Sequence, residues 1–140
     1  MRKINMIIWH CTATPEGKDF TVDDIRRWHV NGNGWQDIGY HFVVYRDGTV
    51  HLGRPIEKAG AHVKNKNANS IGCVYIGGCD STGKKAKDTR TDAQKKAMVE
   101  LTKELLKQYP NCTVHGHNEF DNKACPCFDV KEWVKDNKII

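Results

Sequence analysis

The side chains most able to do chemistry lie near the C-terminal end of the chain, in residues 115–129. This stretch contains two histidines, His115 and His117, and two cysteines, Cys125 and Cys127. Imidazole nitrogen and thiolate sulfur suit zinc, and a site with three protein ligands keeps a fourth position for water. From the residues alone the ligand set stays open, because the two histidines can share one face of a strand and either cysteine could join them.

A further ligand can come from the opposite end of the chain. Residues 4–10 are apolar and rich in β-formers, and a polar turn at residues 11–15 follows them, which predicts a central strand that ends at His10. In open α/β sheets, ligands bind at the carboxyl ends of the strands. His10 is therefore in a position to complete a metal site.

The remaining pattern predicts an α/β fold with a single domain over residues 1–140, in which about three helices flank a central mixed β-sheet of about five strands. Asp47-Gly48 predicts a hairpin between strands at 38–45 and 50–52. Further strands are expected at 71–76 and 113–115. Helices are expected to begin after three capping residues, Thr21, Thr91 and Asp129. Residues 53–70 form a long loop, and residues 80–90 a solvated connection.

Composition excludes several classes of protein. The 22 basic and 17 acidic residues give a formal charge of +5 without a polybasic arm, so nucleic acid is not the expected partner. No apolar run approaches the ~20 residues of a membrane span. The N-terminal apolar run is short and contains Asn5, so we expect synthesis in the cytoplasm without a signal peptide, and a soluble monomer. The six cysteines then favour free thiols plus a metal ligand.

Four motifs occur in order along the chain. They are WHCTAT at 9–14, GYHF at 39–42 followed by RDGTV at 46–50, NSIG at 69–72, and KACP at 123–126. Together they resemble the zinc-dependent N-acetylmuramoyl-L-alanine amidases of the amidase-2 family, of the T-odd phage lysozyme type, which are related to peptidoglycan recognition proteins. The resemblance extends over roughly residues 7–133.

The resemblance implies roles for individual residues. His10, His117 and Cys125 correspond to the zinc ligands, which leaves His115 and Cys127 outside the ligand set. Tyr40 and Lys123 correspond to the catalytic tyrosine and lysine.

Three further residues are candidates for substrate binding. His62 corresponds to a histidine along the family's substrate groove, while Asn69 could touch the peptide or anchor the loop, and Trp35 could line the groove or pack in the core. His29, His41 and His51 have no assigned role, although one of them could orient a zinc ligand.

The function implied is cleavage of the amide bond between N-acetylmuramic acid and L-alanine in peptidoglycan. A phage or prophage endolysin, acting on the cell wall after release or lysis, fits such an enzyme. One alternative is a non-catalytic peptidoglycan-binding module of the same fold, and another is a structural zinc site with His115 or Cys127 as a fourth ligand. The T-odd relatives also bind their phage RNA polymerase, but no surface for a regulatory protein partner is recognisable in this sequence.

Overall fold

The central sheet is organised around β1 (Met6–Cys11), whose apolar side chains are buried on both faces. The computed structural model describes residues 2–140. Two parallel strands flank β1, β5 (Ser70–Tyr75) on one side and β7 (Thr113–Gly116) on the other. Strands that are covered on both faces read as continuous apolar runs, which is the pattern of β1 and β5.

The rest of the sheet comes from the predicted hairpin. β3 (Phe42–Val44) runs parallel to β5, and β4 (Val50–Leu52) pairs with it in the antiparallel direction, so the strand order is β4-β3-β5-β1-β7. The mixed sheet of five strands is confirmed. The hairpin's first strand is shorter than predicted. Before Phe42 the backbone of Tyr40 and His41 still hydrogen-bonds to residues 53, 54 and 72, but Gly39 bonds to Ala61 of the following loop instead. A second, two-stranded sheet of β2 (Thr14–Pro15) and β6 (Gly78–Cys79) was not predicted.

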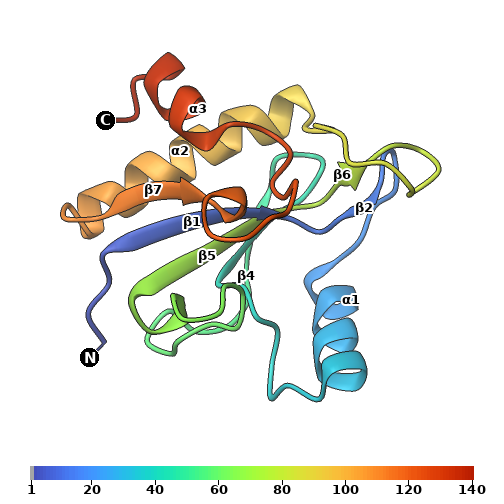
Figure 1. Ribbon diagram of the computed structural model, residues 1–140, viewed down its shortest axis with the longest axis horizontal. Helices are drawn as coiled ribbons and strands as arrows, with labels where there is room; N and C mark the ends of the chain where they lie inside the picture. Colours follow the sequence, from blue (N-terminus) through green and yellow to red (C-terminus); the bar gives the residue numbers. More distant parts are fainter. Residues whose placement is uncertain (1) are drawn as a thin grey trace.

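Two helices cover one face of the sheet, as Figure 1 shows for α2 (Asp92–Gln108) and α3 (Val130–Asp136). Ile7, Trp9 and Cys11 of β1 point toward them and belong to the larger apolar cluster. Trp9 also donates a hydrogen bond from Nε1 to Thr102 Oγ1 of α2 at 3.0 Å. The predicted helix caps Thr91 and Asp129 are both present.

On the other face, Val22 and Ile25 of α1 (Val22–Arg27) join a second apolar cluster with Val43 and Val74. His62, in the loop that follows β4, lies against Gly72 of β5 on the same face. Thr21 caps α1 as predicted, in a reciprocal capping box with Asp24. The helix then widens into a π-helical turn at Trp28–Gly32. Trp28 is 41% exposed and packs on Phe20.

The connection at residues 80–90 is solvated as predicted, since residues 81–88 are exposed, and only the Arg90 side chain at its end is buried. The guanidinium of Arg90 lies over the Phe128 ring, 3.5 Å from its centroid, and pairs with Asp88. This contact could not be predicted from the sequence, because Phe128 lies far along the chain from Arg90. Within residues 2–140, no helix is long and apolar enough to cross a membrane.

Candidate metal centre and active site

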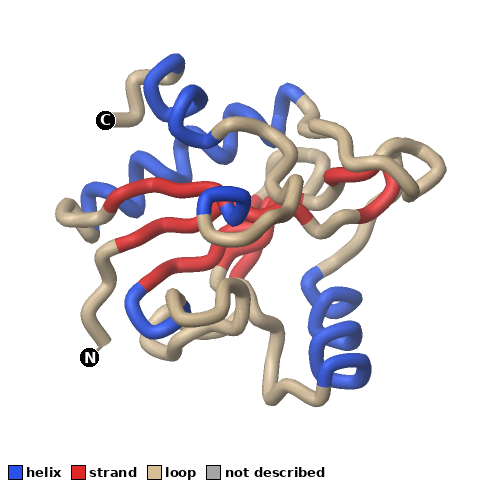
Figure 2. Tube along the Cα trace, in the orientation of Figure 1, coloured by secondary structure: helices blue, strands red, loops and turns tan. Residues whose placement is uncertain are grey.

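Strand register brings His10 and His117 together. Trp9 is paired with Gly116 across the β1–β7 ladder, so the next residues of the two segments, His10 and His117, lie side by side. The centroids of the two imidazole rings are 4.7 Å apart. His117 begins a short 3-10 helix, His117–Glu119, which Figure 2 shows at the start of the long loop between β7 and α3. The pair therefore lies at the carboxyl ends of neighbouring parallel strands, where α/β folds bind ligands.

Cys125 reaches the same place from that loop. Its Sγ accepts a hydrogen bond from the backbone N–H of Cys11 at 3.2 Å and lies 3.9 Å from His10 Nδ1. One ligand atom from each of His10, His117 and Cys125 lies within 4.8 Å of the other two. Two imidazoles and a thiol at this spacing could bind a metal ion.

The surroundings favour the protonation states that bind metals. Burial, reinforced by His62, His117 and Lys123, holds the pKa of His10 well below its ordinary value, so the ring is neutral. The neighbouring Cys11 thiol lowers the pKa of Cys125, and the Cys11 N–H and the charge of Lys123 add to this effect. A neutral imidazole and a thiolate are the forms that coordinate metals.

The Nε2 atoms of His10 and His117 each contact a further side chain outside the potential ligand group. His10 Nε2 lies 2.8 Å from His62 Nδ1, and His117 Nε2 lies 2.6 Å from a carboxylate oxygen of Asp121. Such outer partners fix the orientation of metal-binding histidines.

Tyr40 and Lys123 lie around the pocket that contains these ligands. The Tyr40 ring is 5.2 Å from that of His10. Burial, together with the nearby thiols of Cys125 and Cys11, raises the pKa of Tyr40, so its phenol keeps its proton. Lys123 is exposed and precedes Cys125 by two residues. The pocket is thus lined by three potential metal ligands, a neutral phenol and an ammonium group.

Comparison with known proteins identifies the family. The family model for N-acetylmuramoyl-L-alanine amidase matches residues 1–128. The chain belongs to this family. It is 40% identical to the endolysin of Klebsiella phage KP32 over 99% of this chain and 91% of that protein. It is 41% identical to the endolysin of Escherichia phage T7 over 96% of this chain and 87% of that protein.

A solved structure agrees with this membership. The N-acetylmuramoyl-L-alanine amidase LysC from Clostridium intestinale superposes with a TM-score of 0.81 at 26% identity, over 99% of this chain and 88% of that one. The family resemblance of the four motifs and the predicted α/β fold are both confirmed, and the chain is an N-acetylmuramoyl-L-alanine amidase, a peptidoglycan hydrolase.

The predicted groove residues of this amidase fall into two groups. Trp35 and His62 line the pocket, together with Ala61. Asn69 is not among the lining residues, and its backbone carbonyl accepts a hydrogen bond from Asn5 N at 2.9 Å. Its role as a substrate contact stays a prediction. The asparagine that shapes this loop is Asn67, which sequence reasoning missed because neither asparagine carries a distinctive spacing.

Other histidines and cysteines near the site have partners of their own. His115 contacts Glu119 at 2.8 Å and Thr113 at 2.6 Å through its two ring nitrogens. Cys127 Sγ lies 3.9 Å from Cys11 Sγ and 3.3 Å from the Gly78 carbonyl oxygen. Neither residue belongs to the group that could bind a metal.

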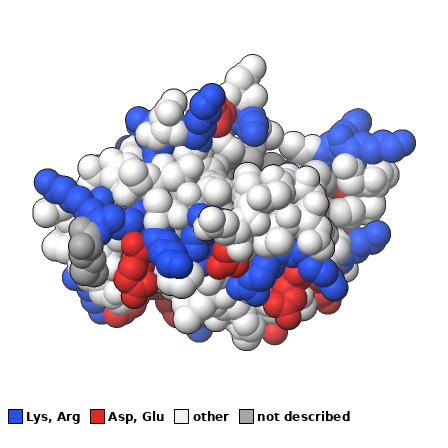
Figure 3. Space-filling view, turned by 90° about the horizontal axis from the view of Figure 1, so that it is seen from below, with Lys and Arg blue, Asp and Glu red and all other residues white. Residues whose placement is uncertain are grey.

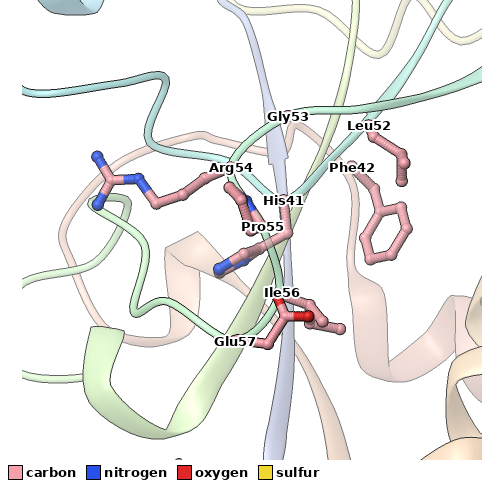
Figure 4. Close-up of a pocket in the computed structure, with 8 residues that line it drawn as sticks. All are labelled: His41, Phe42, Leu52, Gly53, Arg54, Pro55, Ile56 and Glu57. Carbon is pink, nitrogen blue, oxygen red and sulfur yellow. The ribbon is translucent and has the colours of Figure 1, made fainter.

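His41 faces a different pocket, beside β3 and β4. Figure 4 shows its imidazole there, with the side chains of Phe42, Leu52 and Ile56. None of the predicted ligands lines this pocket. Of the histidines without an assigned role, His29 accepts a hydrogen bond from Gly39 N at 2.9 Å, and His51 stacks on Tyr45.

The surface charge does not single out one class of partner. On the face drawn in Figure 3, lysine and arginine side chains are interspersed with acidic ones rather than gathered in one continuous patch. That face therefore shows no continuous basic patch of the kind expected for nucleic-acid binding.

Proposed function

We propose that this chain uses a zinc ion, held by His10, His117 and Cys125, to hydrolyse the amide bond between N-acetylmuramic acid and L-alanine. The observation that carries the proposal is the convergence of these three ligands with Tyr40 and Lys123 around one pocket. A set of three protein ligands is typical of catalytic zinc sites, whereas structural sites usually have four. A bound zinc ion would lower the pKa of a water molecule toward neutrality and polarise the scissile carbonyl.

The chain's own residues supply the rest of the chemistry. Tyr40 keeps its phenolic proton and can orient the attacking water or relay a proton. The Lys123 ammonium can meet the negative charge that develops on the amide oxygen during attack. Trp35 and Ala61 line the same pocket and would orient the muramyl peptide there.

A structural zinc site is the less favoured alternative. It would need a fourth ligand, and the two candidates, His115 and Cys127, contact Glu119, Thr113, Cys11 and Gly78 instead. A non-catalytic binding module is also less favoured, because a protein that only binds peptidoglycan has no need of a metal-binding triad beside a neutral phenol and an ammonium group.

The setting proposed is that of a phage or prophage endolysin. The relatives from phages KP32 and T7 bear that name, and both match over nearly their whole length. On this proposal the protein reaches the wall after lysis or release.

Mass analysis of digested peptidoglycan tests the proposal. The zinc-loaded protein should release stem peptides with a new amino terminus on L-alanine, and a chelator should stop the release. Cys125→Ala should lose zinc and activity together, whereas Cys127→Ala, two residues away and outside the ligand group, should keep both. New reducing sugar ends, or binding to the wall without release, would overturn the proposal.

A further inference from the structure

His10 is held from behind by a second histidine. We propose that His62 is a positioning residue, which accepts the Nε2 hydrogen of His10 and so keeps His10 Nδ1 directed at the metal. This inference rests on the proposed metal site. The two nitrogens, His10 Nε2 and His62 Nδ1, are 2.8 Å apart, and the rings meet nearly edge to face with an interplanar angle of 87°.

The orientation of His10 decides which of its nitrogens can bind the metal. Cys125 Sγ lies 3.9 Å from His10 Nδ1, so that nitrogen faces the other ligands. When Nδ1 coordinates a metal, the neutral ring carries its hydrogen on Nε2. The only role left for His62 Nδ1 at 2.8 Å is then that of hydrogen-bond acceptor.

Two glycines leave space for the imidazole ring of His62. Gly72 lies in β5 opposite Ile8 of β1, on the side of the sheet that His10 faces. A Cβ at Gly72 would lie 2.6 Å from His62 Cδ2, and one at Gly60 would lie 2.8 Å from the same atom. Any larger residue at either position would push the imidazole away from His10.

Hydrogen bonds also hold the loop that carries His62 and the Nε2 side of its ring. The Asn67 side-chain oxygen accepts hydrogen bonds from the N–H groups of His62 at 2.9 Å and Val63 at 3.0 Å. His62 Nε2 lies 3.1 Å from Ser70 Oγ. With Nδ1 as acceptor, the His62 hydrogen is on Nε2 and is donated to Ser70. The result is a directed series of hydrogen bonds, from His10 to His62 to Ser70.

The second histidine ligand has an analogous partner of different chemistry. His117 Nε2 contacts the carboxylate of Asp121, which is 42% exposed. His10 instead has a neutral, half-buried imidazole as its partner. A neutral acceptor fixes the tautomer of His10 without placing another negative charge near the Cys125 thiolate.

Zinc affinity of three variants tests the inference. His62→Phe keeps a ring of similar size but removes the acceptor, and should weaken zinc binding by about 10- to 100-fold. His62→Gln keeps an acceptor and should recover most of the affinity. His51→Phe, in the hairpin and distant from the site, should bind zinc as the wild type does. Ser70→Ala, which removes only the outer partner, should weaken binding less than His62→Phe.

The tautomer of His10 distinguishes a hydrogen-bonding role of His62 from a purely structural one, because loss of packing alone would not change the tautomer. Imidazole ¹⁵N NMR of the metal-free wild type should find the His10 hydrogen on Nε2. In His62→Phe the two tautomers of His10 should mix, while the thermal midpoint of the metal-free variant verifies that it folds. Ser70→Ala provides the same comparison if His62→Phe fails to fold.

The outcomes separate the inference from the proposed function. A wild type that does not bind zinc would overturn both. If the wild type binds zinc and His62→Phe binds it equally well, the inference alone is overturned. Equal losses in His62→Phe and His62→Gln would also overturn it, because they would indicate packing rather than hydrogen bonding.

Discussion

Lys123 and Lys131 illustrate how position gives identical side chains different roles. Lys123 lies on the pocket that contains the ligands, whereas Lys131 is an exposed residue of α3 whose contact is Glu119 at 3.6 Å. We expect Lys123→Ala to keep zinc and to lose about 10²- to 10³-fold in kcat, the scale of removing one group that stabilises an oxyanion. Steady-state kinetics on soluble muramyl peptides, with zinc content measured in parallel, checks this. Lys131→Ala should behave as wild type, and equal losses in both would contradict the assignment.

His41 makes stability depend on pH. Burial, with Arg2 and Arg54 nearby, lowers the pKa of His41 to about 4, and its Nδ1 accepts a hydrogen bond from Gly72 N. The unfolded chain has an ordinary histidine pKa near 6.5 and takes up the proton first. The stabilising contribution of the neutral ring is therefore complete above pH 6.5 and is lost as the pH falls toward 4.

We expect the free energy of unfolding of the metal-free protein to fall over this range, with His41 contributing roughly 3 kcal/mol. Denaturant unfolding at several pH values measures the slope. In His41→Gln the slope should be shallower, although His10, His29 and His62, whose pKa values burial also lowers, keep part of it. Identical slopes in wild type and variant would show that His41 titrates alike in both states.

At the scale of elements, the N-terminus of α2 is tied to the sheet by one buried side chain. Gln94 Oε1 accepts a hydrogen bond from Thr91 N, which completes the capping box. Its Nε2 donates to the carbonyl oxygens of Ile76 at 3.0 Å and Val44 at 3.4 Å. One residue therefore caps the helix and satisfies the ends of β3 and β5.

Gln94→Ala should lower the free energy of unfolding by about 2–3 kcal/mol, since it leaves the carbonyl of Ile76 without its side-chain donor, whereas that of Val44 still accepts from Ile76 N. Asp24→Ala is the matched control, because Asp24 completes the capping box of α1 but makes no bond to the sheet. It should cost about 0.5–1 kcal/mol. Urea titrations of both variants measure the difference, and equal costs would mean that the contacts of Gln94 with the sheet contribute nothing.

At the scale of the whole molecule, the proposed metal site links distant parts of the chain. His10 is the last residue but one of β1, His117 follows β7, and Cys125 lies in the loop before α3. These ligands are close together only in the folded state, so metal binding should stabilise the fold. Zinc in hundredfold excess over its Kd adds about 2.7 kcal/mol, or roughly 5–10 °C in Tm. Calorimetry with and without a chelator measures the shift, which should vanish in Cys125→Ala.

Local patterns in the sequence determined much of the fold. The three helix caps and the Asp47-Gly48 turn depend on neighbours within a few residues, and all four appear where they were predicted. The apolar runs of β1 and β5 likewise identified the buried strands. The four motifs identified the family, because their residues and their order along the chain can be recognised from the sequence alone.

Tertiary structure decided what depends on register and on distant partners. The small β2–β6 sheet, the stacking of Arg90 on Phe128 and the π-helical turn at Trp28 have no local signal. At the site, the sequence offered two cysteines and several histidines. Only the β1–β7 register and the path of the loop set the distances among His10, His117 and Cys125. The contact between His10 and His62 joins residues 52 positions apart. It exists because parallel strands bring their carboxyl ends together and Gly72 leaves room for a ring above them.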